Sequence, residues 1–270
     1  MLTREPIKKV SDGNLLAIIG RWVVFYIREI GRATQLLAEA VFYIPQAYKR
    51  RARREILVQM YVYGIKSLGV LTIVALFTGM ILALQTGIEL RRFDQEVNIG
   101  TAVMVSMLRE MGPFMTGLIL AACVGSAMAA QIGTMVVSEE IAALEIMAIN
   151  PVRFLVMPRL IAMAFMTPLM SFYTCVMGIL GGGLVGMTQL GVSWGKYIDN
   201  ATLYATTKDF HVGLLKAFLF GVVITVVSCY EGFSTAPGAL GVGQATRRAV
   251  IVSFLLILVV GYFVTRLFYV

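Results

Sequence analysis

Five apolar stretches constrain this chain more than any other feature. They cover residues 56–84, 103–137, 160–190, 212–230 and 249–268. A helix needs roughly 20 residues to cross a bilayer, and each stretch is long enough to do so. Only 14% of the 270 residues are charged, and the mean hydropathy is +0.83, so a soluble core could not bury this much apolar surface. The sequence therefore predicts an all-α membrane protein with five transmembrane helices.

The segment before the first stretch, residues 15–48, has the pattern of a helix with two different faces. One face carries Arg21, Arg28, Arg32, Gln35 and Glu39, and the opposite face carries Trp22, Tyr26, Ile30, Ala33, Leu37, Val41 and Ile44. A helix of this kind is expected to lie in the membrane interface. The alternative is a further crossing, which would place Arg28, Glu29 and Arg32 near mid-membrane at a cost of about 2.5–3.5 kcal/mol each.

Basic residues are unevenly divided between the two sides of the predicted bundle. One side would carry Lys49, Arg50, Arg51, Arg53, Arg54, Arg153, Arg159, Arg247 and Arg248. The other side would carry Arg91, Arg92, Lys196 and Lys208, mixed with acidic residues. Cytoplasmic loops hold the excess of lysine and arginine, so we expect a cytoplasmic amino end and a carboxyl end on the outer side. The net charge of +8 then reflects membrane topology, and we expect no nucleic-acid partner.

Small residues recur at every fourth position in the second and third apolar stretches. They are Gly117, Ala121, Gly125, Ala129 and Gly133, followed by Gly178, Gly182 and Gly186. Residues four apart share one helix face, and a face of small residues lets helix backbones approach closely. Two interpretations remain open: a tight or sliding contact between protomers, or ordinary packing within the chain.

Arg109 and Glu110 lie inside the second apolar stretch, just before Gly112 and Pro113. The proline should kink the helix or begin a new segment. Ionisable side chains at membrane depth are costly and usually functional, so we expect a role for this pair. Gln85, near the end of the first stretch, is another polar residue that should lie close by. The alternative is a pair that is solvated by lipid headgroups.

A short amphipathic helix is expected at 138–150, between the second and third stretches on the cytoplasmic side. Ser138 is a suitable N-cap, Glu139 and Glu140 suit the first turn, and Asn150-Pro151 should end the helix. Its apolar content exceeds what a simple connector needs. We therefore expect it to dock a partner with basic groups, the alternative being a connector that lies on the membrane.

Signatures of catalysis, nucleotide binding and metal binding are missing from the sequence. His211 is the only histidine and should lie near an outer loop. The segment 236–247 superficially resembles a phosphate-binding loop, but Gln244 stands where lysine is required, and a glycine-rich turn is the better interpretation. The cysteines lie in apolar stretches without metal-ligand spacing and are expected to be buried: Cys123, Cys175 and Cys229. We expect no enzyme activity, cofactor or metal in this chain.

Several ordered motifs resemble those of the MlaE/YrbE permease family, the membrane subunits of ATP-binding-cassette (ABC) lipid transporters that work with MCE proteins. In the first two stretches they are Gly79-Met80, Leu84-Gln85, Leu108-Arg109-Glu110-Met111-Gly112-Pro113, Gly125-Ser126-Ala127, Ala130, Gly133, Met135 and Glu139. Further along they are Glu145, Met147, Pro151, Arg153, Pro158, Arg159, Gly241-Val242-Gly243-Gln244-Ala245-Thr246 and Ala249-Val250. The resemblance runs from about Gln59 to the C-terminus.

This resemblance implies a fold, a function and a set of partners. It implies an interfacial helical segment at 1–54 and a permease domain at 55–270, in a multi-pass protein of the bacterial inner membrane. The chain would act as a homodimer with an ABC ATPase that holds the ATP and magnesium, a ring of MCE proteins on the outer side and, as a further partner, a small cytoplasmic accessory subunit. Phospholipid would enter a cavity at the dimer interface.

The resemblance also assigns residues to these roles. The lipid path would include Leu84, Gln85, Arg109, Glu110 and Met111. The ATPase would dock on the cytoplasmic helix through Glu139, Glu140, Leu144, Glu145, Met147, Pro151 and Arg153. Arg109 and Glu110 would hold or gate the headgroup end of the lipid, and apolar neighbours would face its acyl chains.

The sequence departs from the family's pattern at several positions. The family often has arginine, glutamate and arginine where this chain has Cys123, Gln131 and Val136. Joint loss is expected if these charges compensated one another in a buried set, because removal of one partner alone is costly. Arg247 also replaces a usual threonine.

Two other functional classes compete with a lipid permease. A secondary transporter would need an inverted repeat and ionisable residues at mid-membrane, and its transport would depend on an ion gradient. A non-transporting scaffold would tolerate alanine at Glu110, whereas a permease with that substitution should assemble but move lipid poorly. An intramembrane enzyme is the least favoured class, because catalytic residues are missing.

Overall fold

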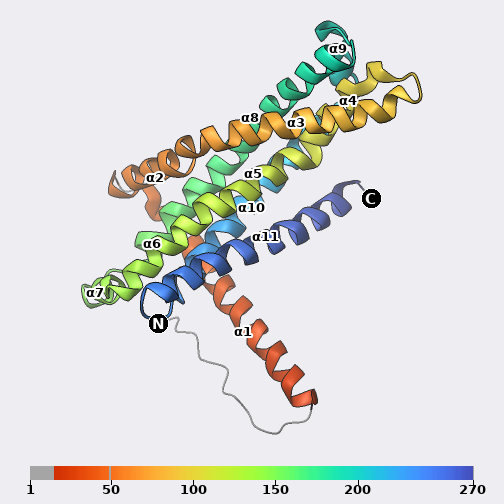
Figure 1. Ribbon diagram of the computed structural model, residues 1–270. Helices are drawn as coiled ribbons and strands as arrows, with labels where there is room; N and C mark the ends of the chain where they lie inside the picture. The colour runs from red at the N-terminus through yellow and green to blue at the C-terminus, as the bar shows by residue number, and fades with distance from the viewer. Residues whose placement is uncertain (1–14, 49, 270) are drawn as a thin grey trace.

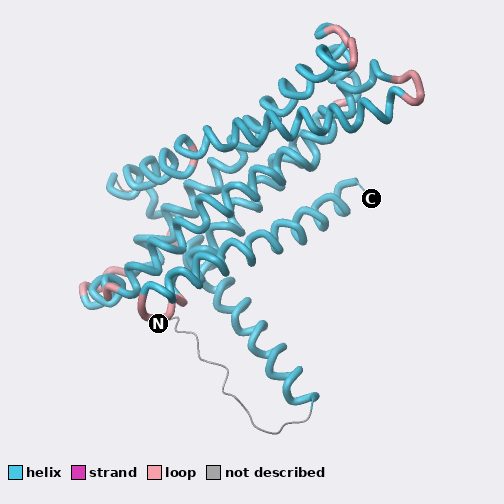
Figure 2. Tube along the Cα trace, viewed as in Figure 1, coloured by secondary structure: helices cyan, strands magenta, loops and turns pink. Residues whose placement is uncertain are grey.

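The computed structural model describes residues 15–48 and 50–269, and all regular elements within those ranges are helical (Figures 1 and 2). Five helical segments are long and apolar enough to cross a membrane, and we call them the first to fifth spans: Ala52–Arg91, Glu96–Val137, Val152–Gln189, Thr207–Phe233 and Ala239–Tyr269. The prediction of an all-α protein with five crossings is confirmed. Each span begins before the apolar stretch that predicted it, because helical turns that contain polar residues precede the apolar run.

The first three spans are built from several consecutive helical elements. The first comprises α2 (Arg50–Tyr63) from Ala52 onward, a 3-10 turn at Ile65–Ser67 and α3 (Leu68–Arg91). The second contains a 3-10 turn at Glu96–Asn98, α4 (Ile99–Ser106), α5 (Gly112–Leu120) and α6 (Ser126–Val137), with π-helical turns at Met107–Met111 and Ala121–Gly125. The third joins a π-helical turn at Val152–Val156 to α8 (Met157–Gln189). The remaining two spans are the single helices α10 (Thr207–Phe233) and α11 (Ala239–Tyr269).

The N-terminal helix α1 (Leu15–Phe42) is not among the five segments suited to cross a membrane, and it runs steeply across the direction of the bundle (Figure 1). It continues into a 3-10 turn at Ile44–Tyr48. Leu36 and Ala40 are buried against the bundle, whereas Trp22 and Ile30 remain more than half exposed. The Tyr230 hydroxyl on α10 donates a 2.8 Å hydrogen bond to Glu29. A helix with one docked edge and an exposed apolar face suits the membrane interface.

Glycine contacts draw the third span against the first. A Cβ atom at Gly79 of α3 would overlap the carbonyl oxygen of Gly178 in α8, and one at Gly181 would overlap that of Leu76. Such contacts let two backbones pack directly, which is the main route to helix association in lipid, where lipid tails compete with apolar side chains. The same two helices bury Leu71 and Ala75.

Helix α9 (Trp194–Tyr204) packs against α4 at one end of the bundle (Figure 1). We call this side of the membrane the α9 side. Tyr197 is completely buried there, and its hydroxyl donates to the Ile179 carbonyl at 3.0 Å. Burial raises the pKa of this hydroxyl above its ordinary value, so it remains protonated and able to donate.

The opposite side carries α7 (Glu140–Ile146), and we call it the α7 side. This helix is shorter than the predicted 138–150, and the residues expected to begin and end it, Ser138 and Asn150-Pro151, have other roles. Ser138 donates to the Thr134 carbonyl and so completes α6, while Glu139 occupies the N-cap position with a φ of 61°. Ala148, with a φ of 56°, follows the other end. The chain therefore turns sharply on both sides of α7.

The start of the fifth span also differs from the prediction. A glycine-rich turn was expected across 236–247, but α11 already begins at Ala239 and the turn is confined to the residues around Pro237-Gly238. Gly238 has a φ of 88°, a conformation that glycine adopts readily. The turn at Gly238 is enough to reverse the chain. Gly241, Gly243 and Gln244 are therefore not needed for the turn and belong to α11.

Two glycine substitutions in α3 test the backbone contact with α8. We expect Gly79→Ala to destabilise the protein by about 1–3 kcal/mol, because the added methyl group would overlap backbone that cannot move independently. Gly69→Ala is the matched control: a Cβ there meets nothing within 4 Å, so it should be neutral or slightly stabilising through helix propensity. Denaturant titration of the detergent-solubilised variants measures the difference. Equal stability of the two variants would rule out the close α3–α8 contact.

Candidate functional site

Four charged side chains meet near the α9 side of the membrane, and we call them the four-charge cluster: Arg109, Glu110, Asp209 and Lys216. Arg109 donates two hydrogen bonds to Asp209, from Nε to Oδ1 at 2.6 Å and from Nη2 to Oδ2 at 3.3 Å. Lys216 Nζ lies 2.6 Å from Glu110 Oε1. One arginine and one lysine therefore neutralise two acids. Ionisable residues within membrane-spanning segments are usually paired in this way.

Asp209 is held by the start of α10 and the end of α11. It is the third residue of α10, and it forms a capping box with Thr206, in which each side chain bonds the other's backbone N–H. The Tyr269 hydroxyl, at the last residue of α11, donates to Asp209 Oδ1 at 2.7 Å. The Arg109 guanidinium stacks over the Tyr269 ring, 4.7 Å from its centre. These contacts place the cluster at the helix ends on the α9 side.

Lys216 is 1% exposed, and all three of its ammonium hydrogens have acceptors. They are the Arg109 carbonyl at 2.8 Å, Glu110 Oε1 at 2.6 Å and the Thr265 hydroxyl at 2.7 Å. A buried lysine normally pays a large desolvation penalty, which these bonds offset. Through these hydrogen bonds, Lys216 of α10 connects Thr265 of α11 with the π-helical turn of the second span.

Pro113 explains why a lysine is needed at this point. Proline lacks an N–H, so the Arg109 carbonyl four residues earlier loses its usual α-helical donor. The chain relaxes into the π-helical turn Met107–Met111, in which the Gly112 N–H donates to the Met107 carbonyl. Lys216 donates to the Arg109 carbonyl that proline left without its donor. Of the two outcomes predicted for Pro113, a kink or a new segment, the structure shows a new segment: α5 begins at Gly112, directly after the π-helical turn.

The structure brings only part of the predicted lipid path together. Arg109 and Glu110 are half-exposed members of the cluster, and Met111 packs beside them in an apolar core. Leu84 and Gln85 lie exposed on α3, and no hydrogen bond or ion pair connects Gln85 with Arg109 or Glu110.

Four members of the site were missed by sequence reasoning: Asp209, Lys216, Thr265 and Tyr269. Lys216, a lone cation inside the fourth apolar stretch, was a usable signal, because a lysine there needs a buried acceptor. The Thr206–Asp209 spacing also marks a helix start.

A second polar contact lies near the α7 side. Arg159 is 6% exposed and donates to the Tyr63 hydroxyl at 3.1 Å, the Leu155 carbonyl at 2.8 Å and Gln131 Oε1 at 3.3 Å. Gln131 therefore satisfies this arginine without a negative charge. The expectation of a lost buried charge set is wrong at two positions, because Cys123 and Gln131 are exposed within the chain. Cys175 and Cys229 are buried as expected.

The stripes of small residues face other helices of the same chain. All five in the second span are buried: Gly117, Ala121, Gly125, Ala129 and Gly133. Added Cβ atoms would meet Phe220 and Ile257 from Gly117, Ser228 from Gly125 and Thr235 from Gly133. In the third span, Gly178 meets Met107, Gly182 meets Val103 and Tyr197, and Gly186 lies beside Tyr197. Both stripes therefore serve packing within the chain.

The segment around α7 displays its polar and apolar residues together. Glu139, Glu140, Glu145 and Met147 are exposed, whereas Leu144, Pro151 and Arg153 are half-buried. Ile146 is 87% exposed. Asn150 does not end α7: its Oδ1 accepts the Val152 N–H at 2.8 Å, so Asn150 and Pro151 begin the third span. Its Nδ2 donates to Glu39 of α1 at 2.7 Å, which connects this segment to α1.

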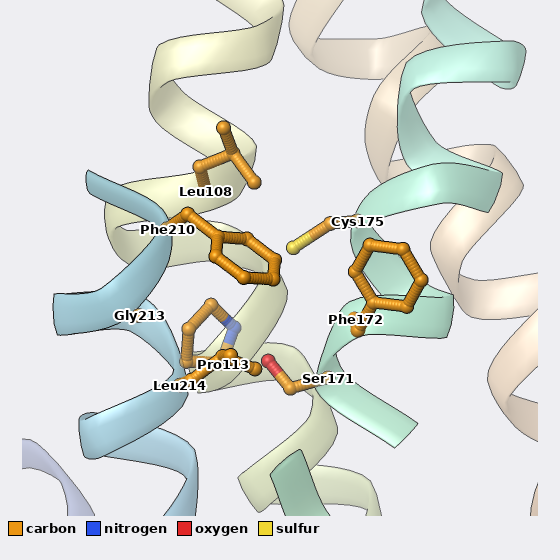
Figure 3. Close-up of a pocket in the computed structure, with 8 residues that line it drawn as sticks. All are labelled: Leu108, Pro113, Ser171, Phe172, Cys175, Phe210, Gly213 and Leu214. Carbon is orange, nitrogen blue, oxygen red and sulfur yellow. The ribbon is translucent and has the colours of Figure 1, made fainter. Parts of the chain in front are cut away.

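Figure 3 shows an apolar pocket between the second, third and fourth spans, with Phe172, Cys175 and Phe210 at its rim. Its cavity volume of about 10 Å³ leaves room for roughly one water molecule, far less than a small-molecule ligand needs. Phe210 and Leu214 face it from a side of α10 different from that of Asp209 and Lys216. The pocket is thus separate from the four-charge cluster. No group of residues able to hold a metal ion occurs in the described ranges.

A double-substitution cycle tests the Lys216–Glu110 pair. Lys216→Met and Glu110→Gln should each destabilise the protein by about 1–3 kcal/mol, less than a fully buried pair because Glu110 is 41% exposed. The double variant should lose less than the sum, by about 1 kcal/mol or more, because neither charge is left alone. Denaturant titration in detergent measures the cycle, with His211→Gln as an exposed control in α10. Strict additivity would show that the pair is not coupled.

Comparison with known proteins gives a consistent assignment. The family described as "Permease MlaE" matches residues 56–267. A "Probable ABC transporter permease protein" of Rickettsia conorii is 36% identical over 95% of this chain and 98% of its own. The "Intermembrane phospholipid transport system permease protein MlaE" of Haemophilus influenzae is 34% identical with the same coverage of both chains. The chloroplastic protein TRIGALACTOSYLDIACYLGLYCEROL 1 of Arabidopsis thaliana is 32% identical over 80% of this chain and 62% of its own. A match over most of the five spans shows that this chain belongs to the MlaE permease family.

Proposed function

We propose that this chain is the permease subunit of an ATP-driven phospholipid transporter that exchanges lipid with an MCE-protein assembly. The four-charge cluster carries the proposal. It places half-exposed charged groups at membrane depth beside apolar helices, and that combination matches a molecule with a polar head and apolar tails. The Haemophilus relative named for phospholipid transport supports the same substrate class.

The headgroup end of the lipid would contact Arg109 and Glu110. Both side chains are about 40% exposed, while their partners Asp209 and Lys216 are buried. Met111 and the exposed Leu84 and Gln85 would line the path beside them, with acyl chains against apolar neighbours. The accessible cavity would form between two copies of the chain.

The motor would be a separate ABC ATPase that docks on α7. The exposed acids Glu139, Glu140 and Glu145 suit a basic partner surface, and Ile146 and Met147 offer an apolar anchor next to them. Docking there would place the α7 side in the cytoplasm, with the MCE ring and the C-terminus on the α9 side. The excess of basic residues on the α7 side supports this orientation. ATP and magnesium would belong to the motor, and a small accessory subunit could join it.

The function is tested by reconstitution. The chain is co-purified with an ABC ATPase and an MCE protein from the same genome, and fluorescent phospholipid is followed between vesicles and the MCE protein. We expect ATP-dependent lipid transfer with the complete complex, and no ATP hydrolysis by the purified chain alone. Transfer that ignores ATP but follows a proton or sodium gradient would instead identify a secondary transporter.

The docking role of α7 predicts a separable defect. Ile146→Ser should weaken ATPase binding about tenfold or more, because a well-packed apolar anchor is worth roughly 1–2 kcal/mol or more at an interface. The fold should be unaffected, since Ile146 is 87% exposed. Leu203→Ser is the matched control, an exposed leucine on the α9 side. Binding is measured by titration of the ATPase onto the permease in nanodiscs. An equal effect of both substitutions would place the ATPase elsewhere.

A further inference from the structure

The exposed members of the four-charge cluster have opposite signs. Arg109 is 39% exposed and pairs with the fully buried Asp209, whereas Glu110 is 41% exposed and pairs with Lys216, which is 1% exposed. One ion pair therefore exposes its positive member and the other exposes its negative member. A ligand that reaches the cluster meets a guanidinium and a carboxylate from consecutive residues.

The buried members have no bonding capacity left for a ligand. Lys216 donates its three hydrogens to the Arg109 carbonyl, Glu110 and Thr265. Asp209 accepts from Arg109, from the Tyr269 hydroxyl, and from both the hydroxyl and the N–H of Thr206. Any further hydrogen bond must therefore involve Arg109 or Glu110.

Each exposed member keeps one polar atom that no described residue engages. Arg109 uses Nε and Nη2 to bind Asp209, which leaves Nη1 to donate to a ligand. Glu110 receives Lys216 and Thr265 on Oε1, which leaves Oε2 to accept. Nη1 suits an anionic oxygen such as that of a phosphate, and Oε2 suits an ammonium hydrogen.

We propose that the four-charge cluster selects lipids whose headgroup combines a phosphate with a primary ammonium. The phosphate would bind Arg109 Nη1, and the ammonium would bind Glu110 Oε2. This inference rests on the proposed function and names its substrate class. The cluster is neutral by itself, so a zwitterionic headgroup leaves it neutral. An anionic headgroup would add an uncompensated negative charge at membrane depth, where such charge is costly.

The two lipid partners make separable contributions. Replacing the primary ammonium with a trimethylammonium keeps the charge but removes the hydrogens that Glu110 Oε2 would accept. Replacing it with a glycerol group removes the positive charge altogether. A charge-assisted hydrogen bond is worth about tenfold or more in binding, so the primary ammonium lipid should exceed both competitors by that order.

The experiment uses the complete complex in nanodiscs with equal amounts of phosphoethanolamine, phosphocholine and phosphoglycerol lipids that share the same acyl chains. Native mass spectrometry reports which lipids remain bound after release from the nanodisc, and the transfer assay reports which are moved. We expect about tenfold enrichment of the phosphoethanolamine lipid. In the Glu110→Gln/Lys216→Met variant, which removes one ion pair as a unit, that enrichment should fall to about the bulk ratio. Gly69→Ala should retain it.

The outcomes separate this inference from the proposed function. Lipid transfer without headgroup preference, or with preference for the phosphoglycerol lipid, would overturn the zwitterionic assignment and leave a lipid permease standing. Enrichment that persists in the double variant would likewise overturn the role of Glu110. Failure of the wild-type complex to hold or move any lipid would overturn both. The three-lipid comparison on the wild-type complex decides the question even if the double variant does not fold.

Discussion

A bilayer offers no hydrogen bonds to groups inside it, and this constraint governs the whole structure. Backbone groups must be satisfied within the chain, which leaves helices as the elements of all five spans. Where a helix is interrupted, a partner must take the missing place. Pro113 removes the donor for the Arg109 carbonyl, and Lys216 from another helix replaces it. The ion pair between Lys216 and Glu110 then follows, because a buried ammonium cannot remain unpaired.

The same constraint explains why close packing depends on glycine. Apolar side chains gain little from leaving lipid for protein, so helices associate where their backbones can touch. Gly79, Gly178 and Gly181 make such contacts between α3 and α8, and the stripe of small residues in the second span makes them against α10 and α11. Rigid packing on these faces gives the four-charge cluster a fixed frame. The cluster lies where the π-helical turn of the second span meets α10 and α11.

The two sides of the membrane are built for different tasks. On the α9 side, the charges of the four-charge cluster are paired inside the chain, and only Arg109 Nη1 and Glu110 Oε2 are not engaged by described residues. On the α7 side, acids and large apolar residues are displayed without such pairing around a short helix with left-handed residues on both sides. α1 connects to that region through Glu39 and Asn150. A movement imposed at α7 would therefore be passed to α1 as well as to the second and third spans, which α7 joins.

Length, hydropathy and residue spacing determined the number of spans, the two-faced N-terminal helix and the presence of a helix between the second and third spans, because these features depend on local periodicity. The motif around Arg109 and Glu110 also marked the right part of the second span. Only the tertiary structure decided which charges pair, since Asp209 and Lys216 lie about a hundred residues from their partners and their side chains meet through helix packing. It also decided that Gln85 stands apart and that the glycine stripes face the chain's own helices. Residue spacing defines one face of a helix, but what that face contacts depends on where all the other helices lie.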